Sequence, residues 1–433
     1  MGKKNWFSNN TLVLAAVMTM LATVPAVAAE NPEPLSLQQV VNTAVATNPA
    51  VIESQKRWEE KQARIPLATA WQNPQFGIMK DDIPNTSLNP ANAMMTEYSF
   101  RQDIMNPSKL KAMGKMADSD AQMARYNLQD KQMEIYAEAK AAYYDLLYAE
   151  KALEIGKENQ QLMGQLVQIA QVNYSTGMVP LQDTLRAQTE FSSMTSDLLN
   201  MASMGAVAKA KLNTVLGRAA DTPLTVKEEF NAPPPNFNLA NLQQSAQTDK
   251  PAVVGMERQV EMAKNGVTLA RKQQLPDYQF TLSYKDKKQT EMSIEPDTWS
   301  VEVMVMLPIW QGKNKAEIRS ADANLAASQA ALANMQNMAG LDLQMALTEA
   351  QSSWRRIELY KNTVIPQAEQ TYQAGVVSYT NGKVDFMAVL DSLNALRNAK
   401  LDYYKARVDY EKAAANLEKA IGKPLFVSGV QLS

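Results

Sequence analysis

The two halves of the chain repeat one another with a period of about 200 residues. Near the start of each half, Asn48-Pro49-Ala50-Val51 returns 202 residues later as Lys250-Pro251-Ala252-Val253. Near the end, Leu216-Gly217-Arg218 returns 205 residues later as Ile421-Gly422-Lys423. Solenoid repeats are roughly 20–50 residues long, so this longer period indicates one domain-sized unit that is present twice.

The repeat divides the chain into two copies, a connector and two ends. Copy one spans residues 30–218 and copy two spans residues 240–425, with a short tail at 426–433. The segment 219–239 between them contains Pro223 and the run Pro233-Pro234-Pro235. This composition favours an extended, polyproline-like linker over a helix.

Each copy predicts a helix, then a pair of strands, then a very long helical hairpin. In copy one, Pro107 suits the first position of a helix, and no proline follows it until Pro180. A helix over this stretch would be roughly 100 Å long. Apolar residues at heptad spacing predict that its seam packs against other helices: in copy one they are Leu128, Ile135, Ala139, Ala142, Leu146, Ala149 and Leu153, and in copy two Leu325, Leu332, Ala339, Leu343, Ala346, Ala350, Trp354 and Ile357.

Alternating apolar and polar residues predict four strands, near 75–80, 95–104, 278–285 and 298–307. Their length and their terminal aromatic residues are typical of strands that cross an outer membrane, although a soluble hairpin can alternate in the same way. The loops at 81–94 and 286–297 are polar and fit exposed tips outside the cell. Four strands cannot close a barrel around a channel, so several chains would have to share one.

Composition excludes several classes of function. The chain contains no histidine and no cysteine, which removes the commonest general base, the usual zinc ligands and the thiol nucleophile. A net charge of −2 argues against nucleic-acid binding. Residues 1–29, with Lys3, Lys4 and an apolar run before Ala26-Val27-Ala28, predict a cleaved signal peptide without a lipidation cysteine. We therefore expect an exported protein that is not an enzyme and that holds no cofactor or metal.

Two turns and two further motifs resemble the TolC-like outer-membrane efflux proteins. The turns follow the long helices, at 174–183 (YSTGMVPLQD) and 379–386 (YTNGKVDF), and the motifs are LPIWQGK at 307–313 and the two Leu/Ile-Gly-Arg/Lys ends. The resemblance covers essentially the whole mature chain. It implies a mainly α-helical protein with a membrane β-barrel: a homotrimer whose twelve-stranded barrel lies in outer-membrane lipid and continues into an α-helical periplasmic tunnel. It also implies two partners, a periplasmic adaptor and an inner-membrane pump of the RND or another class.

The same resemblance assigns roles to individual residues at the periplasmic mouth. Adaptor hairpins would dock on the two tips, at Gly177, Met178, Val179, Gly382, Lys383 and Val384. Asp391 would form an acidic constriction, since three copies around one axis concentrate negative charge. Tyr379 and Asp183 match the positions of a hydrogen bond that latches the mouth. This chain departs from the family at Ala388 and Val384, where a second acidic residue and a basic residue often lie.

Pro366 lies inside the long helix of copy two, and the matching region of copy one near Leu162 has no proline. Since proline removes a backbone hydrogen bond, we expect a bend in copy two alone. The 25 methionines would suit soft metal ions or fill irregular helix seams, and a slight likeness to the heavy-metal branch leaves metal and drug export open. The alternatives to an efflux duct are a type I protein-secretion channel and a non-channel periplasmic coiled-coil scaffold.

Overall fold

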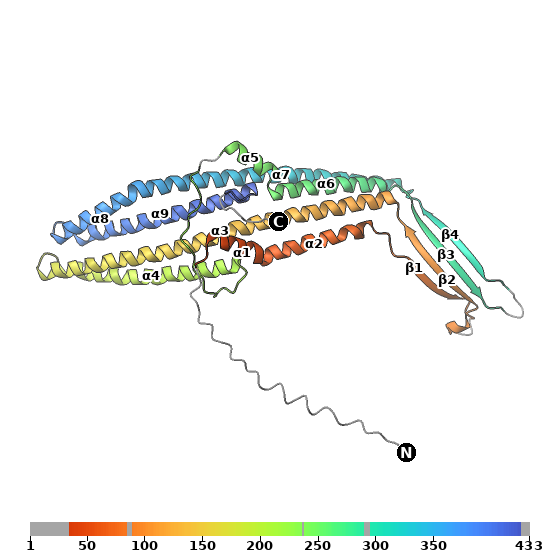
Figure 1. Cartoon of the computed structure of the whole chain (residues 1–433), viewed down its shortest axis with the longest axis horizontal. Coiled ribbons are helices and arrows are strands. Elements are labelled where there is room, and N and C mark those ends of the chain that lie inside the picture. The colour runs from red at the N-terminus through yellow and green to blue at the C-terminus, as the bar shows by residue number, and fades with distance from the viewer. Residues whose placement is uncertain (1–33, 85–88, 236–237, 290–294, 426–433) are drawn as a thin grey trace, which may run out of the picture.

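The computed structural model describes residues 34–84, 89–235, 238–289 and 295–425. Figure 1 shows long helices running side by side, with a four-stranded sheet at one end and two helical hairpin tips at the other. The predicted signal peptide and the tail at 426–433 lie outside the described residues. Copy one contains α1 (Leu37–Thr47), α2 (Pro49–Thr69), β1 (Gln75–Asp81), the short 3-10 helix η1 (Pro90–Asn92), β2 (Met95–Ile104), α3 (Pro107–Ser175) and α4 (Leu181–Val215).

Copy two follows the same order with one interruption. It contains α5 (Leu239–Thr248), α6 (Pro251–Lys272), β3 (Asp277–Lys287), β4 (Thr298–Met306), α7 (Gln311–Leu359), the π-helical turn η2 (Tyr360–Val364), α8 (Ile365–Thr380) and α9 (Phe386–Ile421). Pro49, Pro107 and Pro251 each occupy the first turn of a helix, where a missing backbone N–H costs nothing. The prolines therefore start helices in both copies.

The helices form a wall with α3 near its centre. On the side toward the sheet, α3 packs between α2 and α6, and α6 packs on α7. On the side toward the tips, α3 packs between α4 and α9, and α9 packs on α7 and α8. The predicted seam of copy one lies in this packing: Leu128, Ile135, Ala139, Ala142, Leu146 and Ala149 are all buried, while Leu153 is half-buried.

The linker between the copies packs against the middle of the wall. Leu35 and Val226 form a parallel β-bridge, and Phe230 stacks on Tyr144. Backbone groups of the linker are held by buried side chains, since Tyr143 Oη donates to the carbonyl of Lys227 and the N–H of Ala232 donates to Glu411 Oε1 at 3.0 Å. The segment that the sequence predicts as a connector thus also serves as a strap around the middle of the helical wall. We call this level of the molecule the equator.

A fully buried ion pair joins the two copies beneath this strap. Lys140 Nζ on α3 lies 2.6 Å from Glu418 Oε2 on α9, and the two side chains are 1% and 0% exposed. Tyr136 Oη and the N–H of Leu425 also donate to the Glu418 carboxylate. A second carboxylate, Glu411, accepts from Tyr144 Oη, and burial raises its pKa. Because each buried charge has several partners, the cost of removing it from water is offset.

The four strands form one antiparallel sheet in the order β1-β2-β3-β4. The register aligns apolar residues in rows across all four strands, such as Phe76, Phe100, Leu282 and Val301, and beside it Ile78, Tyr98, Tyr284 and Trp299. The opposite face carries rows such as Gln75, Arg101, Thr281 and Glu302. One face is therefore apolar and the other polar. Separately, none of the described helices combines the length and the apolar character needed to cross a bilayer.

The long helix of copy two breaks where the proline predicted a bend. α3 runs without interruption for 69 residues, whereas α7 ends at Leu359 and η2 precedes Pro366. The N–H of Ile365 bonds to the carbonyl of Tyr360, five residues back instead of four, since Pro366 offers no N–H to continue the regular pattern. Figure 1 shows the helical rod bending between α7 and α8. The predicted difference between the two hairpins is therefore present.

Candidate functional site

The two hairpin tips are built by the same helix-ending motif. Gly177 and Gly382 have φ of +74° and +66°, a conformation that side chains other than hydrogen disfavour. The N–H of Gly177 bonds to Tyr174 O and that of Met178 to Asn173 O; in copy two, the N–H groups of Gly382 and Lys383 make the matching bonds. This paired bonding is the Schellman motif, which satisfies the last carbonyls of α3 and α8.

The predicted docking residues lie on these tips and are mostly open to solvent. Met178, Lys383 and Val384 are exposed, Val179 is half-buried, and both glycines have open space where a side chain would be. The two tips are joined directly, because Asn173 Nδ2 donates to the carbonyl of Tyr379 at 3.0 Å. Nothing in the sequence singles out Asn173, since an asparagine near a helix end is usually a local cap. The tips thus form one surface made by both copies.

The structure does not form the predicted hydrogen bond between Tyr379 and Asp183. The Tyr379 ring is completely buried and packs edge-on against Phe386, with 5.8 Å between ring centroids. Its hydroxyl has no hydrogen-bond partner among the described residues. Burial, together with the negative charge of Asp183, raises the pKa of Tyr379 to about 12. Within one chain the two residues therefore interact through charge, because apolar packing fixes the tyrosine away from the carboxylate.

Asp391 is exposed on α9, between the buried residues Leu390 and Ser392. Leu390 and its neighbours Val389 and Leu393 pack into the apolar cluster that joins the two hairpins below the equator. This cluster fixes the face of α9 that carries Asp391. No ion pair engages its carboxylate in the part of the chain that the structure describes, so the charge stays available to solvent.

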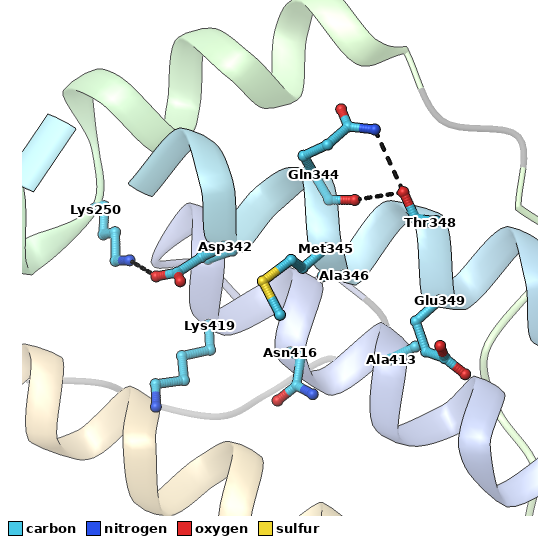
Figure 2. A pocket seen from close by; sticks show the side chains of 11 residues that line it. Lys250, Asp342, Gln344, Met345, Ala346, Thr348, Glu349, Ala413, Asn416 and Lys419 are labelled. Atoms are coloured by element: carbon cyan, nitrogen blue, oxygen red, sulfur yellow. Dashed lines mark hydrogen bonds and ion pairs between the residues drawn. The ribbon is translucent and has the colours of Figure 1, made fainter. Parts of the chain in front are cut away.

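A groove lies elsewhere, between α7 and α9. It has a volume of about 630 Å³ and is bounded at one end by the ion pair of Lys250 with Asp342, 2.8 Å apart. Figure 2 shows Met345 and Asn416 among the residues that line it, with Thr348 bonded to Gln344 along α7. None of the described residues forms a group of three or more potential metal ligands. None of the predicted site residues lines this groove.

Comparison with known proteins agrees with this geometry. The defining pattern of the outer membrane efflux protein family matches residues 40–218 and 242–423, one match for each copy. The chain belongs to the outer membrane efflux protein family. One relative, the cobalt-zinc-cadmium resistance protein CzcC of Cupriavidus metallidurans, is 22% identical over 400 residues and is matched over 92% of both chains.

Solved structures of channel proteins share the fold of this efflux protein. The structure of CusC superposes with a TM-score of 0.77 at 17% identity, covering 90% of this chain and 92% of CusC. The CmeC outer membrane channel of Campylobacter jejuni gives a TM-score of 0.75 at 14% identity, over 89% and 85% of the two chains. The predicted fold class, a helical tunnel with a membrane barrel, is confirmed. The chain is an outer membrane efflux channel, and the periplasmic-scaffold alternative is excluded.

Proposed function

We propose that this efflux protein is the exit duct of a tripartite efflux system and that it works as a homotrimer. The observation that carries the proposal is the open four-stranded sheet. Its outer strands β1 and β4 each have one unpaired edge in the sheet, and the sheet exposes a continuous apolar face. Unpaired strand edges are not tolerated in lipid, so the edges must pair between chains. Three copies would supply twelve strands and a closed wall of helices.

The exposed tips support a second element of the proposal, the docking of a periplasmic adaptor. Met178 and Val384 present apolar surface at the end of the molecule farthest from the sheet, and the neighbouring Lys383 adds a positive charge. Exposed apolar residues with a polar rim are typical of interaction sites. An adaptor held there would connect the duct to an inner-membrane pump of the RND class, which supplies the energy.

The cargo is proposed from the relative and from charge. CzcC is named for resistance to cobalt, zinc and cadmium, metals that form divalent cations in water. Three copies of Asp391, exposed on α9, would form an acidic ring that favours cations over anions. The duct itself carries out no chemistry on this cargo. In support, the sequence contains no histidine or cysteine that could act as a base, nucleophile or tight metal ligand.

The export route is proposed from the N-terminal sequence. Residues 1–29 have the charged start, apolar centre and small-residue end of a cleavable signal peptide. The chain has no cysteine to carry a lipid anchor. The mature protein would therefore be held in the outer membrane by its barrel, with the tips in the periplasm.

Disulfide cross-linking between sheet edges tests the trimer. Met79→Cys on β1 is combined with Ser300→Cys, Glu302→Cys or Met304→Cys on β4, which lie on the same face of the sheet. β1 and β4 are separated by two strands within one chain, and the natural sequence has no cysteine, so any disulfide must join two chains. We expect dimers and trimers on denaturing gels, and nothing larger, for at least one pair. Single-cysteine variants are the controls, and a ladder beyond three copies or no product from any pair would contradict the proposal.

A further inference from the structure

Bulky apolar side chains are exposed where the sheet meets the helices. They lie in or next to three of the four connections between helix and strand. Leu67 lies in the last turn of α2 and Trp71 lies between α2 and β1, and the two are 74% and 55% exposed. Leu275 lies just before β3. Leu307, Ile309 and Trp310 lie between β4 and α7 and are 64%, 65% and 73% exposed. We call these six residues the junction collar.

The most exposed part of the collar is held in a fixed turn. The N–H of Ile309 donates to Leu307 O at 2.9 Å, and the N–H of Gln311 donates to Ile309 O at 3.0 Å. The side-chain amide of Asn314, itself buried, donates to Pro308 O at 2.9 Å. These three bonds hold the backbone in a compact turn. The exposed apolar side chains of this connection are therefore carried by a hydrogen-bonded turn.

Basic residues lie about one helical turn from each part of the collar, on the side toward the helices. Arg64 precedes Leu67 by three residues, Arg271 and Lys272 precede Leu275, and Lys313 and Lys315 follow Trp310. Arg64 and Lys313 pair with glutamates on their own helices, whereas Arg271 and Lys315 have no ion-pair partner within the described ranges. At all three connections, the apolar residues lie toward the sheet and the basic residues lie toward the helices.

We infer that the junction collar binds the leaflet of the membrane that faces the helices and that its basic residues contact anionic phospholipid headgroups there. The inference rests on the proposed function, in which the apolar face of the sheet lies in a bilayer. The collar continues that face past the end of β4, where Val303 and Val305 are exposed. Tryptophan prefers the boundary between lipid tails and headgroups, and lysine and arginine near a membrane surface attract anionic lipid.

The charge of the surface favours lipid over a second protein chain as its occupant. Lysine is depleted from the cores of protein interfaces. Here exposed Lys313, Lys315 and Arg271 lie next to the apolar residues at two separate connections. A phospholipid leaflet offers apolar tails and negative headgroups in the same order along the molecule as the apolar and basic residues of the collar.

Fluorescence quenching by brominated lipid tests the apolar part. Three variants each retain one tryptophan, Trp310, Trp299 or Trp354, with phenylalanine at the other positions. They are reconstituted in vesicles of phosphatidylcholine and phosphatidylglycerol with bromine on the acyl chains. We expect quenching of Trp310 in the collar and of Trp299 on the sheet, and none of Trp354, which packs against Tyr410 at the equator.

The three tryptophans separate failure of the collar from failure of the proposed function. Quenching of Trp299 without quenching of Trp310 would overturn the collar as a lipid site and place Trp310 in a contact between chains or in the channel. Absence of quenching at both positions would contradict the placement of the sheet in the bilayer.

Spin-labelled phosphatidylglycerol tests the basic part. The variant Arg271→Gln/Lys313→Gln/Lys315→Gln should associate with this lipid at least about fivefold more weakly than the parent at low salt, with phosphatidylcholine unaffected. The matched control is Lys157→Gln/Lys361→Gln, which removes exposed lysines from the helices between equator and tips. Equal phosphatidylglycerol association in all three proteins would overturn the assignment of headgroup contacts.

Discussion

The two hairpins come from one duplicated unit and end in the same glycine turn, yet they differ along their length. The long helix of hairpin one, α3, is continuous and packs on both sides at the centre of the wall. The corresponding helix of hairpin two is divided into α7, η2 and α8, and it is largely exposed apart from its contacts with α5, α6 and α9. The shared parts are those that start and stop helices. The difference shows that two similar sequences can form helices of different continuity and burial, because of their position in the wall and a single proline.

The hairpins are also held unequally along their shared boundary. At the equator, α3 and α9 are joined by the buried pair of Lys140 with Glu418. Between the equator and the tips, the charged contacts of α3 with α9 are exposed, such as that of Lys400 Nζ with Glu158 Oε1 at 2.7 Å. Because exposed pairs contribute little, the equator is the fixed point of the two hairpins and the tips are the more easily separated end.

The largest expected effect is on the equatorial joint. Lys140→Ala leaves the Glu418 carboxylate buried without its cation and should lower the free energy of unfolding by about 3–5 kcal/mol. The matched change at the exposed pair, Lys400→Ala, should cost at most about 1 kcal/mol. Denaturant unfolding of the purified protein in detergent measures both. Similar losses in the free energy of unfolding for the two variants would contradict the view that α3 and α9 are held more firmly at the equator than toward the tips.

A proline exchange tests the difference between the two long helices. Leu162→Pro places a proline within α3, at the level of Pro366, and should cost about 3 kcal/mol or more because an interior helical bond is lost. Pro366→Ala should change stability by less than about 1 kcal/mol, since η2 already accommodates the missing N–H. Thermal unfolding compares the variants. If Pro366→Ala proved as destabilising as Leu162→Pro, the proline would be a structural necessity rather than a tolerated bend.

Two glycines with the same backbone conformation should respond differently to alanine. A Cβ at Gly422 would lie 2.5 Å from Pro251 Cδ, so Gly422→Ala should cost about 2–3 kcal/mol through strain and overlap. At Gly382 no atom of the described residues, apart from its own chain neighbours, lies within 4 Å of the added carbon, so only the backbone strain of about 1 kcal/mol remains. Equilibrium unfolding of both variants decides this. A larger loss at Gly382 would mean that the tip packs against another chain.

The smallest expected effect concerns two tyrosines, each three residues before a tip glycine. Tyr379 is fully buried and its hydroxyl has no partner in the part of the chain that the structure describes, whereas Tyr174 is 45% exposed. Tyr379→Phe removes a buried polar group without a partner and should stabilise the protein by about 1 kcal/mol. Tyr174→Phe should be neutral. Destabilisation by Tyr379→Phe would instead support a latch bond that forms when three chains assemble.

Much of the fold was predictable because the determining signals are local. Pro107 and Pro251 start helices, Gly177 and Gly382 end them, and alternation in 298–307 predicts β4, which spans Thr298–Met306. The bend near Pro366 follows from the chemistry of proline alone. The form of that bend, a π-helical turn, depends on which carbonyl finds a donor and is not encoded in any one residue.

Other features depend on contacts between distant parts of the chain. Lys140 and Glu418 are 278 residues apart, and in the sequence each resembles an ordinary charge on a solvated helix face. The strap formed by the linker depends in the same way on Glu411, far along the chain from Ala232. The positions of the two tips were predictable from their glycines. The hydrogen bond of Tyr379 with Asp183 is not formed within the described chain, because Phe386 and its neighbours bury the tyrosine ring. Spacing in the sequence does not reveal this burial.

Single-channel conductance in a planar bilayer tests most directly whether this protein is a cation-favouring duct. The mature protein is compared with Asp391→Asn and with Asp322→Asn, which removes an exposed carboxylate on α7. We expect discrete openings in all three and a preference for cations that Asp391→Asn alone reduces. Unchanged selectivity in Asp391→Asn would contradict the acidic ring, and the absence of any openings would contradict the channel.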